Sequence, residues 1–253
     1  MKRKRKKIIA GILIAIMSGL IIFSGVKLLQ YFDEKTQAEE QFDALSRMTD
    51  TERSSREDKE RADGSRLKRY QKLYEQNHDF IGWLRIEGTN IDYPVMQSGT
   101  EDPEFYLDHD FNKEYSVYGV PFADAACKIG ESNNVILYGH HMTSETMFHE
   151  ITYYADPEFL KDHKRIIFDT LEAEGKYEVI AAFRFDTDHD SFRFNRYTDM
   201  DMTAFAEFVK CVHERELYST GQDALFGEKL LTLSTCDYVY NNGRFVVVAK
   251  EVE

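Results

Sequence analysis

Cysteine is scarce in this sequence. The chain has 253 residues and three cysteines, Cys127, Cys211 and Cys236. An odd and low number argues against the disulfide framework of a small secreted domain and leaves at least one thiol free. Free cysteines are most often buried and inert, and we expect this of Cys211, which stands beside the apolar face of a predicted helix, Met202–Glu214.

Basic charge is also in short supply. The chain has 32 basic and 45 acidic residues, a formal net charge of -13. Six of the basic residues lie in Lys2–Lys7, so the remaining 26 face 45 acidic ones, a balance of -19. Such an acidic surface is a poor electrostatic match for polyphosphates, which excludes nucleic acid as an expected partner.

The motifs that usually hold metals and nucleotides are missing. The sequence contains no Cys-x-x-Cys pair, no phosphate-binding glycine loop and no internal repeat. His140 and His141 are adjacent, so they lack the i, i+4 spacing of a helical zinc pair. The acidic run Asp186–Asp190 lacks the Gly and the terminal Glu of an EF-hand loop. We therefore expect no metal and no cofactor.

One long uncharged run is present, Ile8–Val26. As a helix it would span about 28 Å, close to the hydrocarbon thickness of a bilayer. The basic flank Lys2–Lys7 predicts a cytoplasmic tail (1–7), a signal anchor (8–26) and an extracellular remainder. A cleaved signal peptide is the alternative, but its apolar region is shorter, and no small-x-small cleavage site follows in Val26–Phe32.

A polar stretch separates this run from the globular part. It is dense in charge of both signs, and Phe42, Leu45 and Met48 keep helical spacing only briefly. We predict a stalk or linker over residues 27–68, for which a solvated helix or a disordered chain is the simplest interpretation. The composition becomes globular near Tyr70, which predicts a catalytic domain over residues 69–253.

Short apolar segments separated by turns dominate this domain. Together with two or three helices, they indicate a closed or nearly closed β-barrel. The helices are expected at Leu73–Asp79, Glu145–Tyr154 and Met202–Glu214. The β segments are expected at Phe80–Ile86, Ile91–Met96, Tyr106–Leu107, Gly119–Phe122, Asn134–Tyr138, Ile166–Phe168, Tyr177–Phe185, and on both sides of a turn within Lys229–Ala249.

This last stretch carries the first candidate chemistry. An apolar strand ends at Cys236, a polar turn passes through Asn241–Gly243, and a second strand starts at Arg244. Two strands joined in this way place Cys236 and Arg244 at one rim. A thiolate can attack a carbonyl, and a guanidinium, which never acts as a base, can stabilise the oxyanion that forms. The competing interpretations are a core thiol and a surface cation.

A candidate acid–base group follows another strand. His140 comes after Asn134–Tyr138 and Gly139, and a glycine lets the backbone turn sharply and present the next side chain. An imidazole can protonate a leaving amine and then accept a proton from an incoming one. His141 is the neighbouring alternative, and a lone histidine is more often structural.

These motifs resemble those of the sortases of Gram-positive bacteria. The resemblance rests on Thr232–Cys236, on Arg244 eight positions later and on the box Leu137–Met142. The Tyr-Gly-His-His-Met sequence within this box, followed by Met147–Phe148, resembles class B. The likeness extends from about Tyr70 to the C-terminus. It implies a mainly β (α+β) fold, an eight-stranded barrel with N-terminal helices and a long helix between its sixth and seventh strands, where Met202–Glu214 falls.

The resemblance also implies roles for particular residues. Cys236 would be the nucleophile, His140 the acid–base group and Arg244 the oxyanion-binding cation. Asp237 would be a substrate-side or electrostatic residue. Pro103 stands where many relatives carry Asn, so peptide contacts in that loop differ. The positions expected to line the peptide groove are Ser234, Tyr138 and Leu107.

The activity implied is that of a membrane-anchored cysteine transpeptidase. It would cleave an Asn-Pro-x-Thr or Leu-Pro-x-Thr-Gly-like sorting motif after Thr and transfer the protein to an amino group. The expected partners are secreted proteins with a C-terminal sorting signal, a lipid II-type peptidoglycan precursor and the membrane, with the enzyme a monomer. The alternatives are a pilin polymerase, a hydrolysing cysteine protease and an inert membrane-tethered binding module.

Overall fold

A computed structural model describes residues 2–53, 61–62 and 66–252. The chain divides into two units, Met1–Gln41 and Phe42–Glu253. Met1 and Glu253 lie outside the described residues, as do residues 54–60 and 63–65 of the predicted stalk.

The first unit is helical. Helix α1 (Lys2–Arg53) runs through it and continues into the second unit. By length and composition, the helical stretch Ile16–Thr49 is apolar enough to cross a membrane. This finding is compatible with a membrane anchor or a signal sequence, and the boundaries 8–26 stay a prediction. Among the side chains of this unit that the structure describes, the large apolar ones that are exposed are Leu13, Ile16, Met17, Leu20, Ile21, Ile22, Phe23, Val26, Leu28, Leu29 and Phe32.

The second unit includes the last turns of α1. Phe42, Leu45 and Thr49 are buried there. The Phe42 ring packs edge-on against Tyr93, with 4.9 Å between ring centroids. Phe42 and Leu45 belong to the short run with helical spacing in the predicted stalk. Because both side chains are buried, the packed unit begins before residue 69, the predicted start of the catalytic domain.

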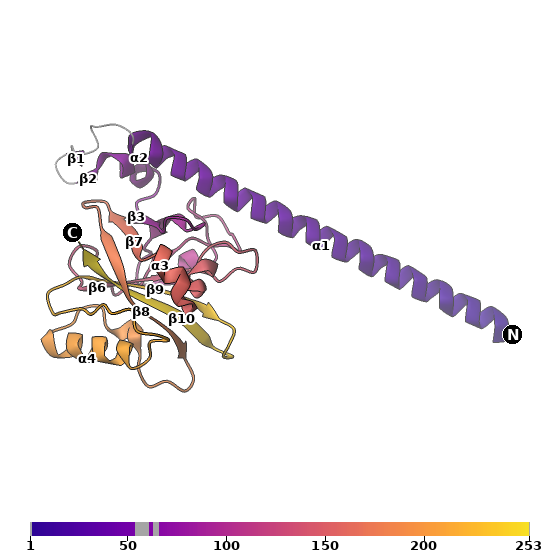
Figure 1. Ribbon diagram of the computed structural model, residues 1–253. Coiled ribbons are helices and arrows are strands. Elements are labelled where there is room, and N and C mark those ends of the chain that lie inside the picture. Colours follow the sequence, from indigo (N-terminus) through magenta and orange to yellow (C-terminus); the bar gives the residue numbers. More distant parts are fainter. Residues whose placement is uncertain (1, 54–60, 63–65, 253) are drawn as a thin grey trace. The chain divides into compact units, whose positions relative to one another are not determined.

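The described residues form a closed barrel of eight strands (Figure 1). Its order around the barrel is β10-β8-β7-β3-β4-β5-β6-β9. The pairs β4–β5 and β6–β9 are parallel, and the other neighbours are antiparallel. The strands are β3 (Phe80–Arg85), β4 (Asp92–Met96), β5 (Phe122–Ala123), β6 (Asn134–Tyr138), β7 (Arg165–Thr170), β8 (Lys176–Asp186), β9 (Leu230–Asp237) and β10 (Gly243–Val252).

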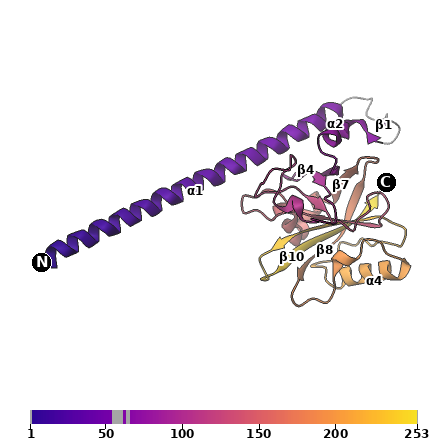
Figure 2. The ribbon, with the colours of Figure 1, turned by 180° about the vertical axis from the view of Figure 1, so that it is seen from behind.

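Helix α4 (Met202–His213) stands between β8 and β9, the sixth and seventh strands of the barrel, as predicted. It begins after Asp201, whose carboxylate accepts a hydrogen bond from the Ala204 N–H at 2.8 Å, because the first N–H groups of a helix have no partner within it. Its apolar face, which includes Phe205 and Phe208, packs into the core. Figures 1 and 2 show α4 and α2 at opposite ends of the barrel.

The other described elements are shorter. They are the two-stranded sheet β1 (Arg61–Ala62) and β2 (Arg66–Leu67), the α-helices α2 (Lys68–Gln76) and α3 (Pro157–Asp162), and the 3-10 helices η2 (Phe105–Leu107), η3 (His149–Ala155) and η4 (Phe194–Arg196).

Two sequence-based predictions of secondary structure were wrong, and a third, the β segment at Gly119–Phe122, holds only at Phe122, where β5 begins. Tyr106–Leu107 lies in η2 and not in a strand. The helix expected at Glu145–Tyr154 is instead a turn followed by η3. Glu145 and Met147 have φ angles of 61° and 57°, in the left-handed region, which a right-handed helix cannot include. The apolar spacing there reflects burial of Met147, Phe148 and Ile151 against the barrel.

Candidate active site

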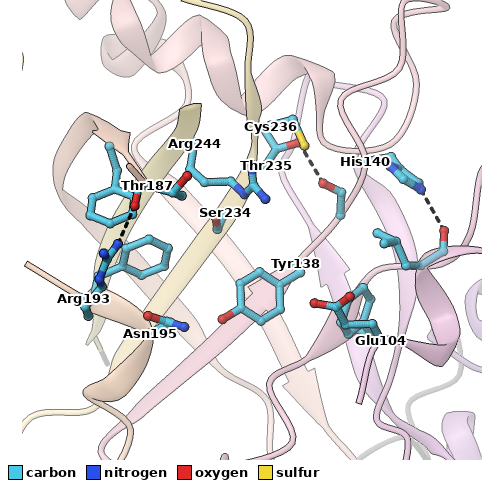
Figure 3. Close-up of a pocket in the computed structure, with 15 residues that line it drawn as sticks. Glu104, Tyr138, His140, Thr187, Arg193, Asn195, Ser234, Thr235, Cys236 and Arg244 are labelled. Atoms are coloured by element: carbon cyan, nitrogen blue, oxygen red, sulfur yellow. Dashed lines mark hydrogen bonds between the residues drawn. The ribbon is translucent and has the colours of Figure 1, made fainter. Parts of the chain in front are cut away.

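The pairing of β9 with β10 places a thiol beside a guanidinium. Cys236 is the direct cross-strand partner of Arg244 in the antiparallel register. Opposite residues in such a pair project from the same face of the sheet. Both side chains are partly buried and line a pocket of about 370 Å³ (Figure 3). The predicted meeting of Cys236 and Arg244 at one rim is therefore present.

The chain segment before His140 is attached to β9 next to the thiol. Strands β6 and β9 run parallel, with Tyr138 paired to Ser234. The Gly139 N–H donates to the Ser234 carbonyl at 3.2 Å. The Thr235 hydroxyl donates to the Gly139 carbonyl at 2.7 Å. These two bonds bring His140 to the pocket that Cys236 lines.

Gly139 is required for a different reason from the predicted one. It is not among the glycines with positive φ, so a left-handed turn does not explain it. A Cβ atom at this position would lie 2.7–2.9 Å from ring carbons of Phe148. Real Cβ atoms do not approach so closely, so the absence of a side chain lets the buried Phe148 ring pack against the backbone before His140.

The His140 ring is oriented by a backbone carbonyl. Its Nε2 lies 2.7 Å from the Leu107 carbonyl oxygen. A carbonyl only accepts hydrogen bonds, so Nε2 carries the proton and Nδ1 is the nitrogen left for proton exchange. Leu107 lines the pocket, as expected of a groove residue, but the role of its carbonyl was not foreseen.

Arg244 and Ser234 have unused capacity to bind a ligand. Arg244 Nη1 donates to the Gly243 carbonyl at 2.9 Å. Within the described part of the chain, no carboxylate forms an ion pair with its guanidinium. The buried Ser234 hydroxyl, also in the pocket, has no hydrogen-bond partner among the described residues. A buried polar group without a partner costs free energy, which favours a ligand that supplies one.

The remaining two predicted residues are placed differently. The Tyr138 ring lines the pocket, and its hydroxyl donates to Asp124 at 2.8 Å. Burial raises the pKa of Tyr138, so the phenol is a neutral donor. Asp237 is not a pocket residue. Side chains alternate along a strand, and Asp237 is buried in an ion pair with Arg184, with 2.8 Å between Oδ2 and Nε.

Comparison with known proteins identifies the family. The family model for the sortase domain matches residues 84–252. The chain belongs to the sortase family. The closed eight-stranded barrel and the candidate nucleophile at the pocket agree with this membership. The individual relatives confirm the resemblance to class B.

Two relatives of this sortase are similar over their whole length. Sortase B of Staphylococcus aureus is 29% identical over 256 residues, covering 100% of this chain and 99% of the relative. Sortase B of Listeria monocytogenes is 29% identical over 254 residues, covering 98% and 99%. The structure of a Staphylococcus aureus sortase B–substrate complex superposes with a TM-score of 0.75 and 26% identity, covering 87% of this chain and 98% of that one. As a class B sortase, the protein is a cysteine transpeptidase.

Several residues of this sortase's site were not found from sequence. His141 Nδ1–H donates to the Cys236 carbonyl at 2.7 Å and so holds the strand end that carries the thiol. The pocket wall opposite η2 comes from the segment between β8 and α4, which carries no catalytic motif. Its pocket residues are Thr187, Arg193, Phe194 and Asn195. In the sequence, only its position next to His140 distinguished His141. No motif indicated that the segment between β8 and α4 forms a wall of the pocket.

Proposed function

We propose that this sortase cleaves secreted proteins after Thr in a sorting motif of the Asn-Pro-x-Thr or Leu-Pro-x-Thr-Gly-like type. The carrying observation is the cross-strand pair of Cys236 and Arg244 in one pocket with His140. The Staphylococcus aureus relative has been solved as a sortase B–substrate complex, which supports the proposal that this fold binds a substrate.

The first half-reaction forms a thioester. The Cys236 thiol gives its proton to His140 Nδ1. The resulting thiolate attacks the carbonyl carbon of Thr, and the C=O electron pair moves to oxygen. Arg244 binds this oxyanion, which places a fixed positive charge where negative charge develops. When the intermediate collapses, the C–N bond breaks and His140 Nδ1 donates a proton to the departing amine.

The second half-reaction transfers the acyl group. An amine of a lipid II-type peptidoglycan precursor attacks the thioester carbonyl, and His140 accepts the proton that the amine loses. The C–S bond then breaks and regenerates the thiolate. The sorted protein is thereby linked to the cell wall. Ser234, Tyr138 and Leu107 line the groove that holds the peptide, and Asp237 acts indirectly, through its ion pair with Arg184.

The enzyme is placed at the membrane by its N-terminal helix. The proposed arrangement has residues 1–7 in the cytoplasm, 8–26 in the bilayer and the remainder outside. The stalk over residues 27–68 belongs to the packed second unit from Phe42 onward and leads into the catalytic domain. The basic run Lys2–Lys7 sets this orientation. Such an anchor holds the domain at the face where secreted proteins and the lipid-linked precursor emerge.

The test is cleavage of a sorting-motif peptide by the purified full chain, with products identified by mass. Cys236→Ala is expected to abolish turnover, and Arg244→Ala to lower kcat/KM by about 10²–10³, the usual cost of losing an oxyanion-binding group. Added amine should speed turnover and appear in the product, because a transferase passes the acyl group to it. Full activity of Cys236→Ala would reject the mechanism, and rates insensitive to amine would favour the hydrolase.

A further inference from the structure

The pocket carries two opposite charges on its walls besides the catalytic groups. Glu104, which directly precedes η2, lines one wall, and Arg193 lines the other. Figure 3 shows them on either side of Tyr138, below Cys236 and His140. A peptide lying in this groove would pass between them. The side chains that the groove can select therefore depend on whether each charge is already bound by other groups of the protein.

Arg193 is largely engaged within the protein. Its Nη1 donates to the Thr187 carbonyl at 2.7 Å. Its guanidinium also lies over the Phe185 ring, 5.9 Å from the ring centroid. These contacts hold the cation against its own wall.

Glu104 makes no comparable contacts among the described residues. In the described part of the chain, its carboxylate makes no hydrogen bond and no ion pair, although its charge contributes to raising the pKa of Tyr138, which burial raises most. The side chain is exposed at the pocket. A carboxylate on a groove wall attracts a cation that enters the groove, and a bound peptide strengthens the attraction by displacing water.

The position of Glu104 is tied to the reacting groups. The Leu107 N–H donates to the Glu104 carbonyl at 2.8 Å, which closes the turn of η2. The Leu107 carbonyl in turn accepts from His140 Nε2 at 2.7 Å. The carboxylate therefore stands on a short rigid turn attached to the acid–base group, and it can select a side chain close to the scissile bond.

We propose that Glu104 is a specificity-determining residue that selects a basic side chain, Lys or Arg, at the variable position x of the sorting motif. The other positions of the motif are each occupied by one residue type. A preference for a charged side chain near the scissile bond can therefore appear only at x. This inference rests on the proposed function. Because Glu104 is exposed, the expected preference is modest, about fivefold in kcat/KM for Lys over Glu, the size of a surface ion pair.

The test uses the full chain and three peptides that differ only in carrying Lys, Gln or Glu at x. Wild type should rank them Lys, then Gln, then Glu. Glu104→Gln should reduce the Lys-to-Glu ratio of kcat/KM to about one, and Glu104→Lys should invert it. Raising NaCl from about 0.05 to about 0.5 M should shrink the wild-type ratio, since salt screens exposed charges.

Glu101→Gln is the matched control. It removes the same charge from the same loop at an exposed residue outside the pocket, so it should keep the wild-type ratio. A ratio that is unchanged in Glu104→Gln, or equally reduced in Glu101→Gln, overturns the inference while leaving the proposed function intact. Failure to cleave any of the three peptides overturns the proposed function and this inference with it.

Discussion

Gly139 shows how much one missing side chain decides at this site. Its N–H and carbonyl both bond to β9, and its Cα faces the buried Phe148 ring. The next residue is His140. Packing at Gly139 therefore also sets the position of His140, the proposed acid–base residue.

Gly139→Ala is expected to lower both stability and turnover. The added methyl must displace Phe148 or the backbone, and overpacking of this kind costs about 1–3 kcal/mol of unfolding free energy. A shifted His140 should lower kcat as well. Thermal unfolding and peptide kinetics measure the two effects. Gly99→Ala is the control, because a Cβ there meets nothing within 4 Å; equal behaviour of the two variants would contradict this account.

The cysteines differ at the same scale. Cys127 is buried, its Sγ accepts from the Ile136 N–H at 3.4 Å, and burial raises the pKa of its thiol to about 12. The Cys127 thiol is therefore almost wholly protonated at pH 8. Cys236 and Cys211 are both partly exposed, so the expectation that Cys211 is buried was wrong, but of the two only Cys236 lines the pocket.

Alkylation of the folded protein at pH 8 should therefore modify Cys236 first and leave Cys127 unmodified. Mass spectrometry of peptides over time gives the order. All three thiols should react once denaturant unfolds the chain. Modification of Cys127 as fast as Cys236 in the folded protein would show that the thiol at 127 is accessible, against the burial described.

Among the elements, the segment between β8 and α4 has the clearest link to substrate binding. It supplies one wall of the pocket and is held from behind by Arg215, which follows α4. Arg215 Nε and Nη2 each donate to one carboxylate oxygen of Asp190 at 2.8 Å, and the guanidinium lies over the Phe192 ring, 4.9 Å from its centroid. A planar fork of this kind fixes position as well as charge.

Arg215→Ala should loosen this wall. We expect KM for the peptide to rise about three- to tenfold, with a smaller change in kcat, because the proposed peptide would lie against the wall with its reacting bond elsewhere. Arg215→Lys keeps the charge but not the fork and should recover only part of the loss. Steady-state kinetics separate the two parameters. An unchanged KM in Arg215→Ala would mean that the wall holds its position without the ion pair.

The same pair predicts a pH dependence. The hydrogen bonds from Arg215 hold the pKa of Asp190 below its usual range. Because the folded pKa is lower than the unfolded one, the stability from this pair is fully present above about pH 4 and is lost as pH falls through the lowered pKa. The unfolding temperatures of wild type and Arg215→Ala should differ equally from pH 7 to about pH 5 and converge in stronger acid. A difference in unfolding temperature that grows as the pH falls would contradict a stabilising role of the ionised Asp190.

At the scale of the whole molecule, a buried ionic cluster connects α2 to the barrel. Arg69 on α2 pairs with Asp169 on β7 at 2.9 Å, with side chains 3% and 4% exposed. The Tyr70 hydroxyl donates to the same Asp169 oxygen at 2.8 Å. Arg69 also pairs with Glu174, which is 60% exposed. The cluster thus attaches helix α2, which precedes the barrel in the chain, to strand β7.

Asp169→Asn should destabilise the second unit by about 3 kcal/mol, because it leaves a buried guanidinium without its buried counter-charge. Glu174→Gln is the matched control and should cost less than about 1 kcal/mol, since that partner is largely solvated. Urea unfolding of the two variants measures both values. A cost for Asp169→Asn no larger than that for Glu174→Gln would mean that the buried pair is not a main attachment of α2.

Local sequence pattern is enough to predict several parts of this protein. The strand Asn134–Tyr138 was predicted to the residue, and Met202–Glu214 differs from α4 by one. The meeting of Cys236 with Arg244 was also predictable, because two apolar strands joined by a short turn pair with each other. The identity of His140 as the acid–base candidate needed the family motif, since spacing alone does not separate it from His141.

The surroundings of these residues come from contacts that form when the barrel closes. The parallel pairing of β6 with β9, the bond from His140 to Leu107, the burial of Phe42 and the wall that carries Arg193 all join positions far apart in the chain. No periodicity within one segment records such a contact, because it depends on how the whole barrel closes. The strand ends and the placement of Cys236 beside Arg244 follow from local chemistry, whereas the shape of the pocket that they line follows from the closed fold.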